Sequence, residues 1–470
     1  MNFTNTVDAS ASFARFIAST DYDSLSEGAR ESARRCILDT LGVTAAATTL
    51  GLGHPQLEAM VRKAGGAAES SVVGFGGRLP IWLAALVNGA MARAVDFDDG
   101  HDESMTHPSS VIVTAAIAMA ERRGGVSGRD LITAVAVGNE ILVRLGLAIA
   151  RGPDGLKLDT WFPSSVFGAF GGTAACCSIL KFDAEHARSA LGIALFEASG
   201  TLEAFSSTGQ KSMMRGMVTG LTAKSATLAA TMVEAGIIGV PDSIEGEFGL
   251  FNVYFGGKYD RGTLLDGLGE VYHSADIGMK PWPTCRYTHA YIDAALQLVR
   301  DDGLKSDDVE KVRIHVAGYA QSRCEPLAQQ RRPHNFNHAG HALPYLVAAA
   351  MVRGRITLSD LINDLDDPAV FAVADRVEPV HDPRFSIENK IGPARIEVEL
   401  KNGDLLVKQT EVVLGGLGNP MSWEDLAAKF RSCVAFSVNP PSPEATERLI
   451  DSLGRLEQVA DIGDVIRDLA

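Results

Sequence analysis

Phe167-Gly-Ala-Phe-Gly-Gly-Thr-Ala-Ala-Cys-Cys-Ser178 is a stretch in which small residues recur at helical spacing. Gly168 and Gly172 lie about one helical turn apart, and a face without side chains lets two helices approach closely. Ala, Gly and Leu continue at this spacing from Thr6 to about Gly269, with breaks at glycine-rich turns. Because this periodicity is that of helices and not of strands, we predict tightly packed helices over this part of the chain.

Several helix ends can be placed from capping residues. Ser26 begins an apolar stripe that continues to Val43, and Ser127 with Asp130 resembles a capping box. Proline suits a first helical turn and glycine suits the position after the last one. On these signals we predict helices over 26–43, 80–95, 108–123 and 211–236, and another that begins at Ser127.

The pattern changes after about Gly269. The segments 309–317 and 394–400 alternate with period two, and Asn402-Gly403 supplies a hairpin turn into 405–412. Helical patterns at 287–300 and 343–352 lie among these strands, and Ser422-Trp-Glu-Asp425 begins a helical tail. We therefore predict a mainly α protein. A large all-helical domain uses both chain ends, 1–268 and 416–470, and 269–415 form an inserted smaller α+β domain.

The charge balance bears on partners. The chain of 470 residues has 43 Lys and Arg against 58 Asp and Glu, a formal net charge of -15. Such a chain repels nucleic acid and anionic membrane surfaces, so we expect neither as a partner. An acidic protein that handles an acidic substrate needs a local basic pocket.

The cysteines and the apolar segments indicate the cellular compartment in which we expect the protein. The six cysteines form no CxxC pair and no disulfide-framework spacing, which argues against iron–sulfur and zinc-ribbon sites. We find no basic and apolar leader at the N-terminus, and no apolar run that reaches the roughly 18 to 20 residues of a membrane span. We expect a cytoplasmic protein. The glycine runs at 74–77 and 415–418 lack the strand and helix context of a dinucleotide loop.

Ala94-Val-Asp-Phe-Asp-Asp-Gly-His-Asp-Glu-Ser-Met-Thr-His-Pro-Ser-Ser110 concentrates acids and imidazoles between two predicted helices. Asp96, Asp98 and Asp99 follow the first helix, where the dipole disfavours carboxylates, so their placement needs a compensating reason. His107 precedes Pro108 at the start of the second helix, and helix N-termini bind anions. Catalysis or anion binding is therefore one interpretation of this segment.

Other interpretations of these residues stay open. A turn rich in Asp, Gly, His and Ser also suits a solvated, self-capping loop. A metal site could use Asp98, Asp99, His101 and His107, although no fixed-spacing motif supports it. His334, His338 and His341 likewise match no strong zinc pattern.

Three further polar residues stand near helix starts. Lys211 precedes an apolar helix, where a cation suggests a bound anion, and Arg215 lies one turn on. A solvated lysine is the plainer alternative. His289 begins the helix after 281–288, where a histidine on an apolar stripe is commonly a satisfied core residue.

Taken together, these segments resemble the MmgE/PrpD family, which includes 2-methylcitrate dehydratase, cis-aconitate decarboxylase and iminodisuccinate epimerase. The resemblance spans nearly the whole chain in ordered blocks. They are Cys36-Ile-Leu-Asp-Thr-Leu-Gly-Val43, Asp96-Phe-Asp-Asp-Gly-His101 with His107-Pro108, the segment from Lys211 to Gly216, Thr284-Cys-Arg-Tyr-Thr-His289, Leu343-Pro-Tyr-Leu-Val-Ala-Ala349, and Gly418-Asn-Pro-Met-Ser422 with Lys429-Phe430.

The resemblance implies a homodimer, an active site in the cleft between the two domains, and no organic or metal cofactor. It implies Asp96, His107, Lys211 and His289 as catalytic residues, with His101 a further candidate. Two positions depart from the family pattern. This chain has Trp161-Phe162-Pro163 where the decarboxylase and dehydratase branches resemble Phe-His-Pro or Trp-His, and Met214 where they place a histidine three residues after the lysine.

The implied chemistry is proton removal from, or return to, a carbon beside a carboxylate. Such a carbon is a weak acid, so the site needs a base of near-neutral pKa and cations for the developing charge. His107 and His101 can be base and acid, with Asp96 orienting an imidazole. Lys211, Arg215 and Arg286 can bind substrate carboxylates, and His289 can protonate a leaving group.

We favour a lyase that dehydrates or decarboxylates a small di- or tricarboxylate. One alternative is an epimerase or isomerase of an iminodisuccinate-like dicarboxylate, which the loss of two imidazoles at Phe162 and Met214 supports. The other is a carboxylate-binding protein without catalysis.

Overall fold

A computed structural model describes residues 8–155, 160–205, 212–385 and 392–470. The chain forms two compact units, one of residues 1–277 with 422–470 and one of residues 278–421. Sequence analysis placed these boundaries at 268 and 415. Most elements are helices and the sheets are small, which confirms the mainly α class with a smaller α+β part.

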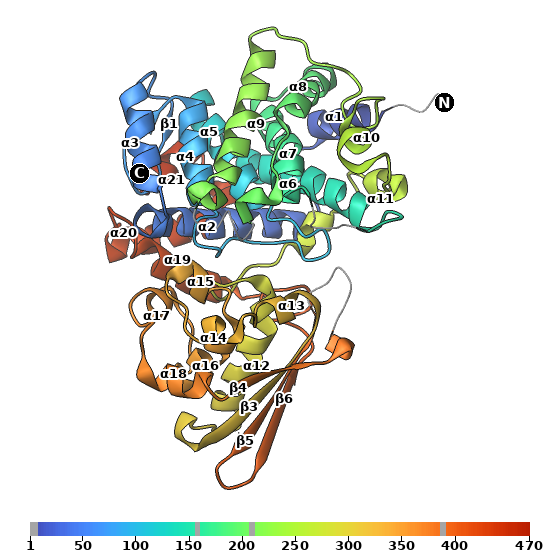
Figure 1. Cartoon of the computed structure of the whole chain (residues 1–470). Coiled ribbons are helices and arrows are strands. Elements are labelled where there is room, and N and C mark those ends of the chain that lie inside the picture. The colour runs from blue at the N-terminus through green and yellow to red at the C-terminus, as the bar shows by residue number, and fades with distance from the viewer. Residues whose placement is uncertain (1–7, 156–159, 206–211, 386–391) are drawn as a thin grey trace. The chain divides into compact units, whose positions relative to one another are not determined.

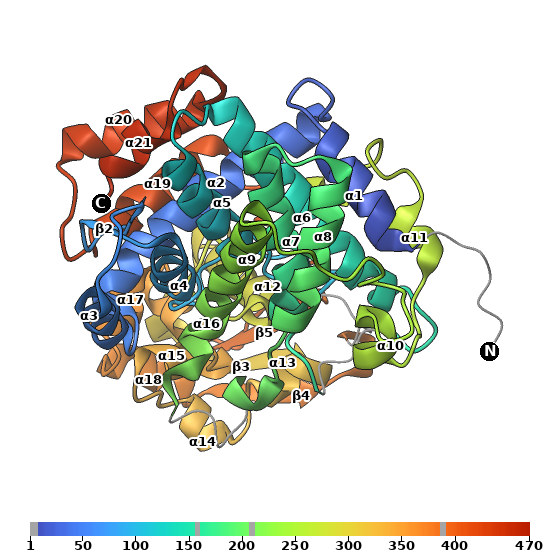
Figure 2. The same ribbon diagram turned by 90° about the horizontal axis from the view of Figure 1, so that it is seen from above.

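Unit 1 is built around helix α7 (Pro163–Leu180), as Figure 2 shows. Its main neighbours are α5 (Ser109–Arg123), α6 (Gly128–Ala150), α8 (Ala184–Glu197) and α9 (Val218–Glu234). A Cβ added at Gly172 would lie 2.7 Å from the Cβ of Ala226 on α9, and one added at Gly171 would lie 2.7 Å from the Gly138 carbonyl oxygen on α6. The predicted close approach of helices at this glycine-rich stretch is confirmed.

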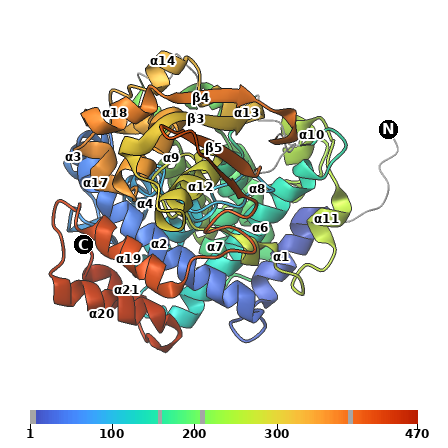
Figure 3. The ribbon, with the colours of Figure 1, turned by 90° about the horizontal axis from the view of Figure 1, so that it is seen from below.

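Helices from both ends of the chain belong to unit 1. Figure 3 shows α19 (Trp423–Val434) beside α2 (Glu27–Leu50). The capping residues expected at Ser26, Ser127 and Ser422 are all N-caps. The remaining helices of this unit are α1 (Ala9–Ser19), α3 (His54–Ala64), α4 (Ile81–Met91), α10 (Leu250–Phe255), α11 (Arg261–Leu265), α20 (Pro443–Gly454) and α21 (Ile462–Arg467).

A buried ion pair joins α19 to α2. The Lys429 ammonium lies 2.6 Å from the Asp39 carboxylate, and both side chains are buried. The same ammonium donates a hydrogen bond of 2.6 Å to the Phe97 carbonyl oxygen and lies 3.8 Å from the centroid of the Phe97 ring. A buried cation is tolerated when paired and hydrogen-bonded in this way.

Three expectations for unit 1 need correction. The helix predicted from residue 211 begins at Val218, because the Ser212 side chain caps a 3-10 turn at Met213–Gly216. The helix predicted to residue 95 ends at Met91, and Asp96 has a left-handed φ of 50° that no helix continues through. The unit is also not all-helical, since β1 (Ser70–Ser71) pairs with β2 (Arg78–Leu79). Strands of two residues are too short to show alternation.

The expectation about apolar runs was also wrong. Helices α6 and α7 are long and apolar enough to cross a membrane by length and composition. In the structure the most apolar window of α6 is 100% buried and that of α7 is 94% buried. Their position within the helical core accounts for their apolar character, because a helix that is apolar all round needs burial on every face.

Unit 2 contains a four-stranded sheet of order β4-β3-β5-β6 (Figure 1). The predicted strands appear as β3 (Val309–Val316), β5 (Ala394–Leu400) and β6 (Leu405–Thr410), paired antiparallel. Sequence analysis missed β4 (Val377–His381), an edge strand that runs parallel to β3. It contains Pro379, and proline within a run argues against a strand unless the strand lies at an edge.

One face of the sheet meets helices. Val312, Ile314, Ile396 and Val398 are buried in a core with residues of α12 (His289–Arg300) and α16 (Leu343–Arg353). The other helices of unit 2 are α13 (Gly318–Ser322), α14 (Leu327–Gln330), α15 (Phe336–Ala339), α17 (Leu358–Ile362) and α18 (Pro368–Ala374).

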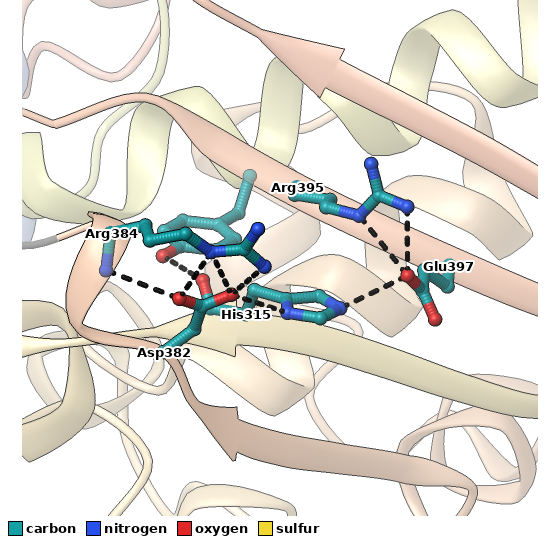
Figure 4. Close-up of polar contacts among 6 residues, drawn as sticks. His315, Asp382, Arg384, Arg395 and Glu397 are labelled. Atoms are coloured by element: carbon teal, nitrogen blue, oxygen red, sulfur yellow. Dashed lines mark hydrogen bonds and ion pairs between the residues drawn. The ribbon is translucent and has the colours of Figure 1, made fainter.

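The opposite face carries an ionic cluster, shown in Figure 4. His315 on β3 has Nδ1 3.2 Å from Asp382 and Nε2 3.2 Å from Glu397 on β5. Arg384 donates to Asp382 at 2.7 Å, and Arg395 donates to Glu397 at 2.9 Å. The guanidinium of Arg384 holds the pKa of Asp382 well below its usual range. The cluster ties the end of β4 to β5 across β3, so we assign it a structural role.

Lys429→Met should strongly destabilise unit 1, because it leaves the Asp39 carboxylate buried without its cation. Breaking a buried pair from one side costs roughly 3 to 5 kcal/mol. Urea unfolding followed by circular dichroism measures the change. Lys408→Met is the control, since Lys408 pairs with Asp302 at 2.8 Å in a partly exposed position where at most about 1 kcal/mol is expected. Equal losses in the two variants would contradict the role given to Lys429.

Candidate active site

The segment between α4 and α5 in unit 1 folds into a closed loop. The His101 N–H donates to the Thr106 carbonyl oxygen at 2.9 Å, and the Thr106 N–H donates back at 3.3 Å. The Ser104 and Thr106 hydroxyls are 2.7 Å apart, and both side chains are buried. The loop is therefore an ordered element, and the interpretation of a merely solvated turn does not fit it.

His107 is held at the end of this loop in a defined orientation. Its backbone N–H donates to the Ser164 hydroxyl on α7 at 2.8 Å. Its ring Nδ1 lies 2.7 Å from the Asp99 carbonyl oxygen and 3.2 Å from the Asp98 carboxylate. Both neighbours are acceptors, so Nδ1 carries the proton and the lone pair of a neutral ring lies on Nε2. The side chain keeps 21% exposure.

The carboxylate beside His107 is Asp98, and not Asp96 as the sequence suggested. Asp98 is buried, and its Oδ2 accepts a hydrogen bond of 2.8 Å from Arg93. Three aspartates within four positions offer the same chemistry, and only the path of the loop selects which one faces the imidazole. The sequence alone did not assign Asp98 the role of orienting an imidazole.

Asp96 lies toward a different cation. Its carboxylate is 3.6 Å from the guanidinium of Arg215, whose side chain is 36% exposed. The left-handed φ of 50° at Asp96 is uncommon outside glycine, and strained backbone often marks functional positions. The structure thus brings Asp96 and Arg215 together, as two members of the predicted site.

An aromatic pair adjoins both arginines. The rings of Phe162 and Phe205 lie 4.7 Å apart, the Arg93 guanidinium is 5.0 Å from the Phe162 ring centroid, and the Arg215 guanidinium is 5.3 Å from that of Phe205. These distances are typical of cation–π contacts. Phe162 is the position where the resemblance leads one to expect a histidine, so an apolar ring stands here in place of a proton carrier.

Asp99, whose carbonyl oxygen contacts His107, is buried. Burial raises the pKa of its carboxyl to about 7, and the nearby charges of Asp39 and Asp98 act in the same direction. The Ser109 N–H at the start of α5 donates to it at 3.3 Å, and a hydrogen bond from the Ser109 side chain opposes the rise in pKa. This carboxyl therefore titrates near neutral pH.

His101 has the contacts of a structural residue. Burial lowers its pKa to about 4, so the ring is neutral at pH 7. Its Nδ1 accepts a hydrogen bond of 3.1 Å from the Ser104 N–H within the loop. That bond uses the lone pair that a base would need, and it stabilises the loop that carries His107.

The other predicted site residues lie elsewhere. In unit 2, the buried His289 has Nε2 3.2 Å from the Thr284 carbonyl oxygen, to which it can only donate, and Nδ1 3.5 Å from the Arg286 guanidinium. Arg286 also donates to the Leu414 carbonyl oxygen at 3.3 Å. The two predicted residues of this unit are therefore neighbours. Lys211 lies outside the described residues.

The geometry of the described residues does not match either of the metal sites considered from the sequence. Within the described ranges, no three His, Cys, Asp or Glu side chains are grouped to hold a metal ion. Among the three histidines at 334–341, the Nδ1 atoms of His334 and His338 are 2.9 Å apart, and His341 Nδ1 lies 2.9 Å from the Asn337 carbonyl oxygen.

Two family models match the chain. The MmgE/PrpD N-terminal domain matches residues 11–262, and the MmgE/PrpD C-terminal domain matches residues 282–454. The chain is also similar to named enzymes. It is 28% identical to the cis-aconitate decarboxylase of Homo sapiens, over 97% of this chain and 94% of the relative.

Other similar proteins are named as a cis-aconitate decarboxylase or as a 2-methylcitrate dehydratase. The cis-aconitate decarboxylase of Aspergillus terreus is 26% identical, over 84% of this chain and 83% of the relative. The 2-methylcitrate dehydratase of Escherichia coli is 23% identical, over 78% of this chain and 77% of the relative. The similarity thus extends to both a decarboxylase and a dehydratase.

His101→Asn should reduce the loss of stability in acid. The pKa of His101 falls from 6.5 to about 4 on folding, so below pH 6.5 the unfolded chain binds more protons and stability falls as the pH drops. Between pH 7.5 and 5 this costs about 2 kcal/mol. Asparagine keeps an acceptor for the Ser104 N–H without the charge. Urea unfolding at the two pH values measures the difference, and an equal acid loss in parent and variant would contradict it.

Proposed function

Because this chain belongs to the MmgE/PrpD family, we propose that it is a lyase that dehydrates or decarboxylates a small di- or tricarboxylate. The observation that carries the proposal is the orientation of His107, whose Nδ1 faces the Asp99 carbonyl oxygen at 2.7 Å and the Asp98 carboxylate at 3.2 Å. This arrangement leaves the basic lone pair on Nε2, as a proton acceptor requires.

The proposed first step of dehydration is removal of a proton from the carbon beside a substrate carboxylate. Nε2 of His107 takes the proton, and the electrons of the C–H bond form a carbon–carbon double bond. The hydroxyl on the neighbouring carbon takes a proton from an acid and leaves as water. Negative charge develops on the substrate carboxylate, so cations beside it lower the barrier.

Decarboxylation uses the same proton transfer in the opposite sense. The bond to a carboxylate breaks, carbon dioxide leaves, and the electron pair on carbon takes a proton from the imidazolium of His107. Relatives of this chain carry names of both kinds, which supports a lyase and leaves both outcomes for the assay.

The cations proposed to bind substrate carboxylates are Arg215, Lys211 and Arg286. Of these three residues, Arg215 belongs to unit 1 and lies within the described part of the chain. Its side chain is partly exposed. We propose His289 as the acid that protonates a leaving group. The ordered bonds around it and Arg286 favour a fixed orientation for both.

One observation favours an epimerase as a second candidate. Phe162 presents a ring that cannot carry a proton, at a position where the resemblance to the lyase branches implies an imidazole. A reaction that only removes a proton and returns one from the other face needs no leaving-group acid there. Such an enzyme would act on an iminodisuccinate-like dicarboxylate.

A panel of di- and tricarboxylates in heavy water, followed by proton NMR, tests these alternatives together. Dehydration and decarboxylation give new alkene or methylene signals, and epimerisation gives deuterium exchange with a change of configuration. Binding without any exchange of carbon-bound protons would instead mean a carboxylate-binding protein without catalysis.

His107→Asn should abolish exchange of the carbon-bound proton in heavy water. Asparagine has similar reach and polarity but cannot accept and return a proton. Thermal unfolding should change little, and His186→Asn, at a surface position, serves as the control. Exchange at the parental rate in His107→Asn would mean that the base is another residue.

Lys211→Ala should lower kcat/KM at least about tenfold, because a charge-assisted hydrogen bond is worth roughly 1.5 to 3 kcal/mol. Steady-state kinetics with a substrate from the panel measures the loss. Lys224→Ala, in α9, is the matched control and should keep parental kinetics. Unchanged kinetics in Lys211→Ala would remove this lysine from the site.

A further inference from the structure

Arg93 has an unusual set of contacts for an arginine. It is 8% exposed, and among the residues that the structure describes its guanidinium donates a hydrogen bond of 2.8 Å to Asp98 Oδ2. The guanidinium also lies over the rings of Phe162 and Phe205, whose centroids are 5.0 and 5.9 Å from the guanidinium carbon. A planar guanidinium can stack on a ring and hydrogen-bond through its edge at once, which a lysine ammonium cannot do.

The oxygen that Arg93 binds is the one that faces His107. Asp98 Oδ2 lies 2.8 Å from Arg93 Nη1 and 3.2 Å from His107 Nδ1. A lone carboxylate at this distance would favour the imidazolium, since an opposite charge within about 4 to 6 Å stabilises the charged form. The guanidinium on the same oxygen offsets that effect.

We propose that Arg93, held by the rings of Phe162 and Phe205, is a positioning residue that keeps His107 unprotonated by neutralising Asp98. The inference rests on the proposed role of His107 as the base. Arg93 itself touches no reacting atom in this scheme. Its contribution is to increase the fraction of protein molecules in which His107 is unprotonated at neutral pH.

Other charged groups surround the imidazole. Asp98 and Asp39 both act electrostatically on the Asp99 carboxyl, which accepts from the Ser109 N–H at the start of α5, and Asp39 pairs with Lys429. A change at Arg93 alters none of these residues. A comparison of variants at Arg93 and Asp98 therefore isolates the effect of the shared oxygen.

The test is an NMR titration of the His107 ring protons in the substrate-free protein, assigned by their absence in His107→Asn. Arg93→Gln removes the cation, and its His107 midpoint should rise by about one pH unit. Arg93→Lys keeps the charge without the stacking and should stay within about 0.3 units of the parent. Asp98→Asn removes the anion and should lower the midpoint.

The kcat/KM profile of each variant gives an independent reading. In Arg93→Gln the fall of kcat/KM on the acid side of the profile should shift to higher pH together with the NMR midpoint. Activity at pH 6 should therefore fall more than activity at pH 8. In Arg93→Lys a lower rate should come without a shift of the limb. A merely structural role of Arg93 would lower the rate of both variants and shift neither limb.

An unchanged His107 midpoint in folded Arg93→Gln would overturn the inference. If that variant does not fold, an unchanged midpoint in Asp98→Asn overturns it instead. The titration needs no substrate, so its failure is distinct from failure of the proposed function, which would appear as the absence of proton exchange with every carboxylate in the panel.

Discussion

The ammonium of Lys429 is the point on which the geometry of unit 1 depends. It binds the Asp39 carboxylate and the Phe97 carbonyl oxygen, each at 2.6 Å, and lies over the Phe97 ring. One cation thus joins α19, α2 and the loop, three segments far apart in sequence. Asp96 and Asp98 flank Phe97, so fixing that residue by its backbone and its ring places both carboxylates: Asp98 beside His107 and Asp96 toward Arg215.

Close helix packing brings the two arginines to one aromatic pair. A Cβ added at Gly89 on α4 would lie 2.9 Å from the Cβ of Ala223 on α9, a contact that allows the helices to approach. Arg93 follows the end of α4, and Arg215 precedes the start of α9. Because these neighbouring helix ends carry the two cations, the Arg93 guanidinium reaches Phe162 and Phe205, and the Arg215 guanidinium reaches Phe205. The small residues that define the fold therefore also determine where charge lies in the site.

Sequence periodicity predicted the parts of the fold whose pattern is local. The strands at 309–316 and 394–400 and the helix at 343–353 were recovered within a residue or two, since each shows its burial in its own spacing. β4 was missed because Pro379 breaks its pattern and only pairing with β3 makes it a strand. In the site, residue type identified the loop but could not choose between Asp96 and Asp98. Arg93 was missed because its contact with Asp98, five residues on, depends on the path of the loop, and Ser164 was missed because its partner His107 is distant in sequence.

The sequence raised the question of why carboxylates should follow a helix whose dipole repels them. The structure removes most of that cost. α4 ends at Met91, so the first aspartate stands five residues beyond it, and Asp98 and Asp96 each face an arginine. Asp99 accepts a hydrogen bond from Ser109 at the start of α5, where a helix dipole favours an anion. Burial still raises the pKa of Asp99 to about 7. Two of the acids are therefore stabilised by arginines and the third by the start of the helix that follows, and this third residue, Asp99, contacts the proposed base through its carbonyl oxygen.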